Sequence, residues 1–211
     1  MDLVVRSPRL PRSGETVLGR SFQEIPGGKG ANQAVAIARL GMDVEMIGRV
    51  GSDEFGRQLL IGLEANSVKT SAVLYTPGSS SGIALISVDD QGDNSIIVIS
   101  GANGHLTQND IADQQHLFAE CDLIVLQLEI PLEAVKTAIK LGRRHEKPVL
   151  LNPAPMPTPF DAELYQVDYF CPNEYEAEKL LGWSLDNEAK IEKAVRTLTQ
   201  RVLGSVIITL G

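Results

Sequence analysis

The 211-residue sequence has no apolar run that approaches the length of about 18 residues needed to span a membrane as a helix. It has only two cysteines, Cys121 and Cys171, without C-x-x-C spacing, so we expect two reduced, buried thiols. Its three histidines, His105, His116 and His145, are scattered. They form neither a zinc-binding pattern nor an evident Ser-His-Asp arrangement, which disfavours both kinds of site.

Positive charge is also scarce. The 19 Lys and Arg residues face 27 Asp and Glu residues, and the formal net charge is −8. This balance argues against nucleic acid or an anionic membrane as a partner. The N-terminal sequence MDLVVRSPRLP lacks the apolar core of a signal peptide, so we expect a cytoplasmic protein.

Glycine, in contrast, is concentrated at one place. Residues 25–41, IPGGKGANQAVAIARLG, put three glycines and Lys29 at the start of a helix predicted over 31–40. Helix N-termini attract anions, but no hydroxyl residue follows Lys29 as in a Walker loop, and no G-x-G-x-x-G is present. What remains is a backbone that a ligand can approach closely, beside the polar side chains of Lys29 and Asn32. A glycine-rich turn before a core helix is the alternative interpretation.

Beyond residue 41, predicted strands mostly alternate with predicted helices. This order implies βαβ units and a parallel sheet with helices on both sides. The predicted strands cover 44–50, 82–88, 94–100, 122–128, 148–152, 167–171 and 205–211, and the predicted helices cover 55–66, 109–120, 131–145, 174–181 and 186–202. We expect one α/β domain over 1–211, with strands of a small antiparallel lid within about 10–25 and 82–100.

Conspicuous polar residues follow three of the predicted strands, at the edge where open parallel sheets bind ligands. They are Glu129, Asn152, and the pair Asn173 and Glu176. A carboxylate there can accept hydrogen bonds from sugar hydroxyls or hold Mg²⁺ through water. Each position also has a structural interpretation: Asn173 and Glu176 match a capping box, Asn152 can end a strand before Pro153, and Glu129 can be a solvated loop acid. Together with the glycine-rich segment and the lid, these residues favour a site for a polyol and a nucleotide phosphate.

Five segments occur in order along essentially the whole chain: GGKGANQAVAIARLG, RVGSDEFG, LQLEIP, LNPAP and PNEYEAEKLLG. Together they resemble the ribokinase family of sugar kinases, the pfkB carbohydrate kinases. GGKGANQA is close to the form in ribokinases themselves, whereas fructokinases and adenosine kinases usually carry another residue in place of Lys29. The resemblance implies a ribokinase-like three-layer α/β sandwich with a central, mostly parallel sheet and a β-lid that often forms a dimer contact.

The resemblance also assigns roles residue by residue. It implies sugar binding by Asp2, Gly28, Lys29, Asn32 and Glu129. It implies nucleotide binding by Asn173, Thr209 and Gly211, and support of Mg²⁺ through water by Glu176. ATP is the implied co-substrate, K⁺ is expected for the full-length protein, and a homodimer through the lid is the implied assembly.

One family signature has no match in this sequence. A D-T-x-G-A-G-D-type segment supplies the family's catalytic Asp and an anion hole of N–H groups, and the nearest string here is SGANG at 100–104. We therefore expect the catalytic Asp beyond Gly211, and a chain truncated at both ends that is inactive by itself. The expected activity of the full-length protein is ATP-dependent phosphorylation of D-ribose at its 5-hydroxyl. The alternatives are a kinase for deoxyribose or another pentose, and a non-catalytic sugar-binding remnant.

Overall fold

The computed structural model describes residues 1–210, which fall into two compact units. The first unit covers Met1–His105, and the second begins at Leu106. Within residues 1–210, none of the helices is both long enough and apolar enough to cross a bilayer. The two units are described separately below.

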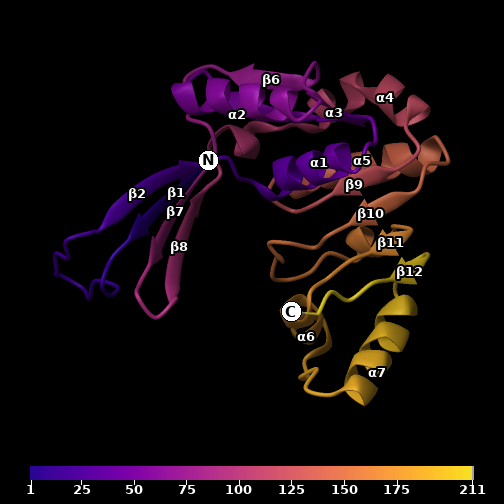
Figure 1. The fold of residues 1–211 in the computed structure, drawn as a ribbon. Coiled ribbons are helices and arrows are strands. Elements are labelled where there is room, and N and C mark those ends of the chain that lie inside the picture. Colours follow the sequence, from indigo (N-terminus) through magenta and orange to yellow (C-terminus); the bar gives the residue numbers. More distant parts are fainter. Residues whose placement is uncertain (211) are drawn as a thin grey trace. The chain divides into compact units, whose positions relative to one another are not determined.

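A four-stranded sheet of the first unit has the order β2-β1-β7-β8 (Figure 1). Its strands are β1 (Asp2–Arg6), β2 (Ser21–Ile25), β7 (Ile83–Val88) and β8 (Asn94–Ile99). The hairpin predicted within 82–100 is formed by β7 and β8, which pair antiparallel. β1 pairs antiparallel with β2 and parallel with β7, so the N-terminal strand is a member of this lid sheet that the sequence did not indicate. Residues 11–20 are not strand.

Two helices of the first unit pack on a small apolar cluster. They are α1 (Lys29–Arg39) and α2 (Glu54–Ala65), and the cluster contains Ala34, Leu63 and Val68. α1 begins two residues earlier than the sequence predicted, so Lys29 belongs to its first turn. The chain leaves α1 through Gly41, whose φ of +87° is a conformation that favours glycine.

The single strand predicted over 44–50 is two short strands. β3 (Val44–Glu45) pairs parallel with β5 (Val68–Lys69), and β4 (Gly48–Gly51) pairs parallel with β6 (Val73–Thr76). The chain therefore changes its pairing partner between residues 45 and 48. The 3₁₀ helix η1 (Gly101–His105) follows β8 and closes the unit.

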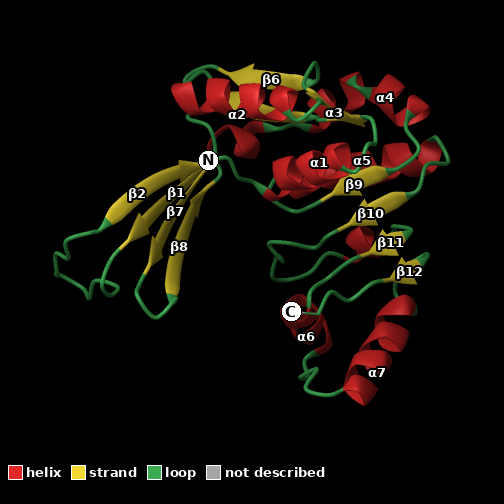
Figure 2. Ribbon diagram, viewed as in Figure 1, coloured by secondary structure: helices red, strands yellow, loops and turns green. Residues whose placement is uncertain are grey.

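The second unit contains a four-stranded parallel sheet of order β12-β11-β10-β9 (Figure 2). Its strands are β9 (Ile124–Leu126), β10 (Val149–Leu151), β11 (Tyr169–Phe170) and β12 (Ser205–Val206). Val149, Leu151 and Phe170 are fully buried, as expected for strands covered on both faces. The strands are shorter than the predicted runs, but the parallel sheet itself is as predicted.

The helices of the second unit follow the predicted βαβ alternation. They are α3 (Gln108–Asp113), α4 (Gln115–Glu120), α5 (Leu132–Arg144), α6 (Glu174–Leu181) and α7 (Glu188–Thr199), with the 3₁₀ helix η2 (Ala162–Tyr165) before β11. The one helix predicted over 109–120 is thus two, divided at Gln114. α6 begins and ends where the sequence placed it, because a capping box starts it and Gly182, with φ of +78°, ends it.

Candidate functional site

Asp2 stands at the start of β1, where its carboxyl group lies against the backbone of Gly27. A β-carbon on Gly27 would overlap all three atoms of that carboxyl group, so any side chain at this position would require the Asp2 carboxyl group to move. Asp2 and Ile25 are partners across the β1–β2 pair, which explains why the GGKG segment begins beside Asp2. The sequence indicated Gly27, Gly28 and Gly30 as a backbone that a ligand can approach, and the structure shows that the Asp2 carboxyl group lies against Gly27.

The first turn of α1 continues this corner. Gly28 is the N-cap residue, with φ of +97°, and no side chain caps the helix. The Asn32 N–H donates to the Gly28 carbonyl at 2.9 Å, while the Asn32 side chain is exposed and Lys29 is half-buried. This segment thus offers the carboxylate acceptor of Asp2, the ammonium donor of Lys29 and the amide of Asn32, next to a glycine backbone that a ligand can approach. Polyhydroxyl ligands are recognised by such a mixture of donors and acceptors.

In the second unit, polar residues follow all four parallel strands at one edge of the sheet. Glu129 comes after β9, Asn152 after β10, Asn173 after β11 and Thr209 after β12. Asn173 and Thr209 form a parallel bridge, and both residues are exposed. The carboxyl-end edge of a parallel sheet is where such folds bind ligands. Glu129, Asn152 and Asn173, which the sequence placed after predicted strands, thus follow neighbouring parallel strands, and the structure adds Thr209 to this row.

Two of these residues have clear structural partners. The Asn152 side-chain amide donates to the Cys171 carbonyl at 2.9 Å, which ties β10 to β11. Asn173 and Glu176 form a reciprocal capping box: the Asn173 N–H donates to Glu176 Oε2 at 2.9 Å, and the Glu176 N–H donates to Asn173 Oδ1 at 2.8 Å. Glu176 is buried, with 7% of its surface exposed. The structural interpretation of this pair is therefore correct, and a functional role has to be additional to it.

Both cysteines are free, as predicted, but they are half-buried rather than fully buried. Burial raises the pKa of the Cys121 thiol, and burial together with the negative charge of Glu176 raises that of Cys171. Raised pKa values keep both thiols protonated at neutral pH, where they are poor nucleophiles.

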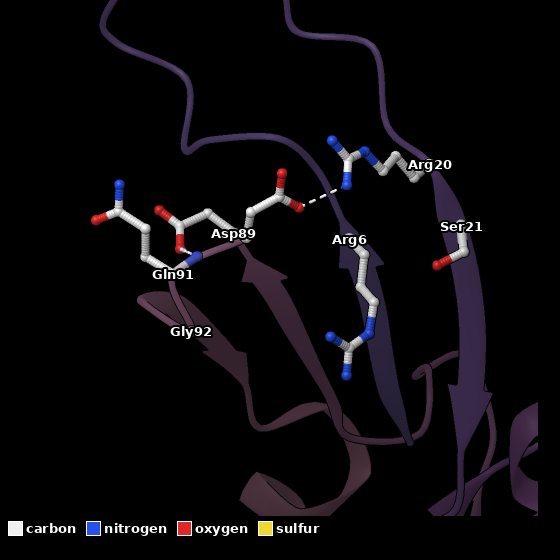
Figure 3. Close-up of a pocket in the computed structure, with 7 residues that line it drawn as sticks. Arg6, Arg20, Ser21, Asp89, Gln91 and Gly92 are labelled. Carbon is white, nitrogen blue, oxygen red and sulfur yellow. Dashed lines mark hydrogen bonds and ion pairs between the residues drawn. The ribbon is translucent and has the colours of Figure 1, made fainter.

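A surface hollow of about 450 Å³ lies at the turn end of the lid sheet (Figure 3). Its lining comprises Arg6, Arg20, Ser21 and the turn Asp89–Gly92. Arg20 donates to Asp90 at 2.8 Å across it. None of the predicted site residues lines this hollow, so its size does not make it the candidate site.

The predicted site residues fall in both units. Asp2, Gly28, Lys29 and Asn32 lie together in the first unit, and Glu129, Asn173, Glu176 and Thr209 lie in the second. Gly211 lies outside the described residues. Within residues 1–210, no group of three or more His, Cys, Asp or Glu side chains is placed to hold a metal directly.

Comparisons with known proteins identify one family. The model of the pfkB family carbohydrate kinases matches residues 1–211. Deoxyribokinase of Salmonella typhi is 41% identical over 212 residues, which cover 100% of this chain and 69% of that protein. Ribokinase of Bacillus subtilis is 45% identical over 180 residues, which cover 85% of this chain and 61% of that protein.

The solved structures include a similar fold. The structure of Arabidopsis thaliana ribokinase complexed with ribose and ATP superposes with a TM-score of 0.91 at 30% identity. The superposition covers 100% of this chain and 69% of that protein. The chain thus matches only part of the length of each of these three relatives.

Proposed function

Because the chain belongs to the pfkB family of carbohydrate kinases and has its ribokinase-like α/β fold, we propose that the protein transfers the γ-phosphoryl group of ATP to the 5-hydroxyl of D-ribose. Family and fold are those that the sequence predicted, and they make the protein a sugar kinase. The observation that supports the sugar most directly is the Asp2 carboxyl group seated on Gly27, beside Lys29 and Asn32. The complex of the Arabidopsis enzyme with ribose and ATP supports the same pair of substrates.

The role proposed for each residue follows from the chemistry of its side chain or backbone. Asp2 and Glu129 accept hydrogen bonds from sugar hydroxyls, Lys29 and Asn32 donate to sugar oxygens, and Gly28 lets the sugar reach the backbone. In-line phosphoryl transfer depends mainly on such positioning and on charge stabilisation around the phosphates. The precision with which these groups hold the 5-hydroxyl therefore sets much of the rate.

Asn173 and Thr209 are the proposed contacts of the nucleotide phosphates. They are exposed neighbours at the carboxyl-end edge of the parallel sheet, which suits an anion that arrives from solvent. Glu176 uses Oε2 in the capping box, and its other carboxylate oxygen is left to accept hydrogen bonds from Mg²⁺-bound water. One carboxylate fits Mg²⁺ held through water rather than directly, since this ion keeps much of its hydration shell.

The lid sheet supports a proposed homodimer. All six residues of β8 are exposed, and Ile96, Ile97 and Val98 each expose more than half of their surface. An edge strand with a row of exposed apolar side chains invites pairing with another chain. A second copy of the lid sheet would cover these residues, and light scattering of the purified protein would measure the resulting mass.

A preference for 2-deoxyribose is the second candidate. The observation that favours it is the similarity to deoxyribokinase, which is 41% identical over the whole chain. The two sugars differ only in the 2-hydroxyl group, so one lost hydrogen bond would separate them by about 0.5–1.5 kcal/mol, or by 1.5–3 if the partner is charged.

The experiment that tests the proposal is a coupled assay of ADP release by the protein expressed from its complete gene. Ribose, 2-deoxyribose, fructose and adenosine are compared with ATP and Mg²⁺. We expect the highest kcat/KM with ribose. A higher value with 2-deoxyribose would transfer the assignment to the second candidate, and preference for fructose or adenosine would contradict both.

A further inference from the structure

The carboxylate of Asp53 joins two segments of the first unit that lie 28 residues apart. At the start of α2, its Oδ1 accepts a hydrogen bond from the Gly56 N–H at 2.9 Å, as an N-cap does. It also accepts two hydrogen bonds from Ser81, one from the hydroxyl to Oδ1 at 2.6 Å and one from the N–H to Oδ2 at 2.8 Å. Ser81 is fully buried, and its hydroxyl oxygen accepts from the Gly51 N–H at 3.0 Å. Capping a helix would need only the first of these contacts.

Close backbone packing holds the same two segments together. A β-carbon on Gly51 would overlap the backbone of residues 79–81, and one on Gly56 would overlap the Gly51 carbonyl. The chain that follows β8, the second strand of the hairpin, comes back to residues 79–81, because the Ala102 N–H donates to the Ser80 carbonyl at 2.8 Å. Both ends of the hairpin are therefore fixed against the corner between β4 and α2.

Strand β7 connects the β4–α2 junction to the proposed sugar site. β7 begins two residues after Ser81, and its second residue, Ala84, is the partner of Asp2 across the parallel β1–β7 pair. The Ala84 N–H donates to the Met1 carbonyl at 3.0 Å. Since ladder hydrogen bonds fix the register of paired strands, the place at which β7 is held determines where the Asp2 carboxyl group meets Gly27.

We propose that Asp53 is a positioning residue for the sugar. By binding Ser81 it fixes the N-terminal end of β7, and because β7 pairs with β1, it thereby fixes the position of Asp2. This inference rests on the proposed function, because it takes Asp2 as a sugar ligand. Asp53 itself does not touch the sugar in this scheme. Its effect on sugar affinity is therefore indirect. Because β7 and Asp2 belong to the sugar site, we expect this effect without a comparable change in ATP affinity.

The test compares Asp53→Asn and Ser81→Ala with the wild-type protein by calorimetric titration of D-ribose and, separately, of ATP with Mg²⁺. Asparagine keeps one acceptor oxygen for the helix cap but cannot accept from both Ser81 groups with two oxygens. We expect the dissociation constant for ribose to rise about tenfold in Asp53→Asn, while that for ATP changes less than about twofold. Ser81→Ala is expected to act in the same direction, and the double variant to add little, since both remove one linkage.

Asp110→Asn is the matched control, because Asp110 supports the Thr107 cap of α3 in the second unit by the same type of hydrogen bond. It is expected to leave ribose affinity unchanged. Amide hydrogen exchange over residues 82–88, measured in the same samples, should be faster in Asp53→Asn than in Asp110→Asn. Folded Asp53→Asn protein with wild-type ribose affinity would overturn the inference, as would equal losses for both sugar and ATP.

The same titrations separate the two hypotheses. If the wild-type protein binds 2-deoxyribose rather than ribose, the substrate assignment fails, and the ratio of variant to wild-type affinity for that sugar still tests Asp53. If the wild-type protein binds no pentose, the proposed function fails and the positioning role fails with it. If it binds a pentose and the Asp53 and Ser81 variants bind it equally well, only the positioning role fails.

Discussion

The carboxyl group of Asp2 occupies the space that a side chain at position 27 would need, so the position of this carboxyl group depends on glycine at residue 27. Gly27→Ala would push that carboxyl group away from the GGKG backbone. We expect weaker ribose binding by about 10- to 100-fold, the equivalent of losing a hydrogen bond to a charged group, about 1.5–3 kcal/mol. ATP affinity should be unchanged. Gly62→Ala, at a glycine of α2 with open space around it, is the control, and equal losses in both variants would refute this reading of Asp2.

Lys29 and Asn32 should affect the sugar far more than the nucleotide. Both lie in the first turn of α1, which begins beside Asp2. We expect Lys29→Ala to raise the KM for ribose by the equivalent of about 1.5–3 kcal/mol, and Asn32→Ala by about 0.5–1.5 kcal/mol. Initial rates with each substrate varied in turn would measure this. An effect confined to the KM for ATP would mean that this corner belongs to the nucleotide.

Glu176 can be tested against its structural role in the capping box. Glu176→Gln keeps a side chain that can accept from the Asn173 N–H, but it removes the charge proposed to support Mg²⁺. We expect a melting temperature near that of the wild-type protein, with a sharply lower kcat and a higher Mg²⁺ requirement. Asp110→Asn changes the other capping box and should leave kinetics alone. Unchanged kinetics in Glu176→Gln would leave the residue with the capping role only.

The Asp53 linkage also predicts a pH dependence of stability. Burial raises the pKa of the Asp53 carboxyl, but hydrogen bonds from Ser81 and Gly56 outweigh burial and leave that pKa below its usual value of 3.8. A carboxyl with a lowered folded-state pKa contributes stability that is complete above the unfolded-state pKa, and that is lost as the pH falls through the folded-state pKa. Melting temperatures of the wild-type protein should therefore fall more steeply below about pH 4 than those of Asp53→Asn. Parallel curves would show that the linkage contributes nothing.

Local signals explain which parts of the fold the sequence predicted well. The Asn173-x-x-Glu176 box and Gly182 define both ends of α6, because capping and left-handed glycine are chemistry of neighbouring residues. Asp53 similarly marks the start of α2. The polar residues after the parallel strands were predicted for the same kind of reason, since the carboxyl ends of such strands share one edge.

Other features depend on contacts between distant segments, which one sequence does not display. The strand predicted over 44–50 divides because β5 and β6, two short strands without strong alternation, pair with its two halves. β1 joins the lid sheet because it lies between β2 and β7. The hydrogen bonds from Ser81 to Asp53 cross 28 residues, and Ser81 lies in a run of serines that resembles any loop.

The most direct test of the proposed function is to measure which sugar the segment GGKGAN and Asp2 bind most tightly. Calorimetric titration of the wild-type protein and of Asp2→Asn with D-ribose, 2-deoxyribose, fructose and adenosine would measure it. We predict the tightest binding for D-ribose, and a loss of about tenfold or more in Asp2→Asn, in line with one hydrogen bond to a charged group. Tighter binding of fructose or adenosine, or ribose affinity that does not change in Asp2→Asn, would contradict the proposal.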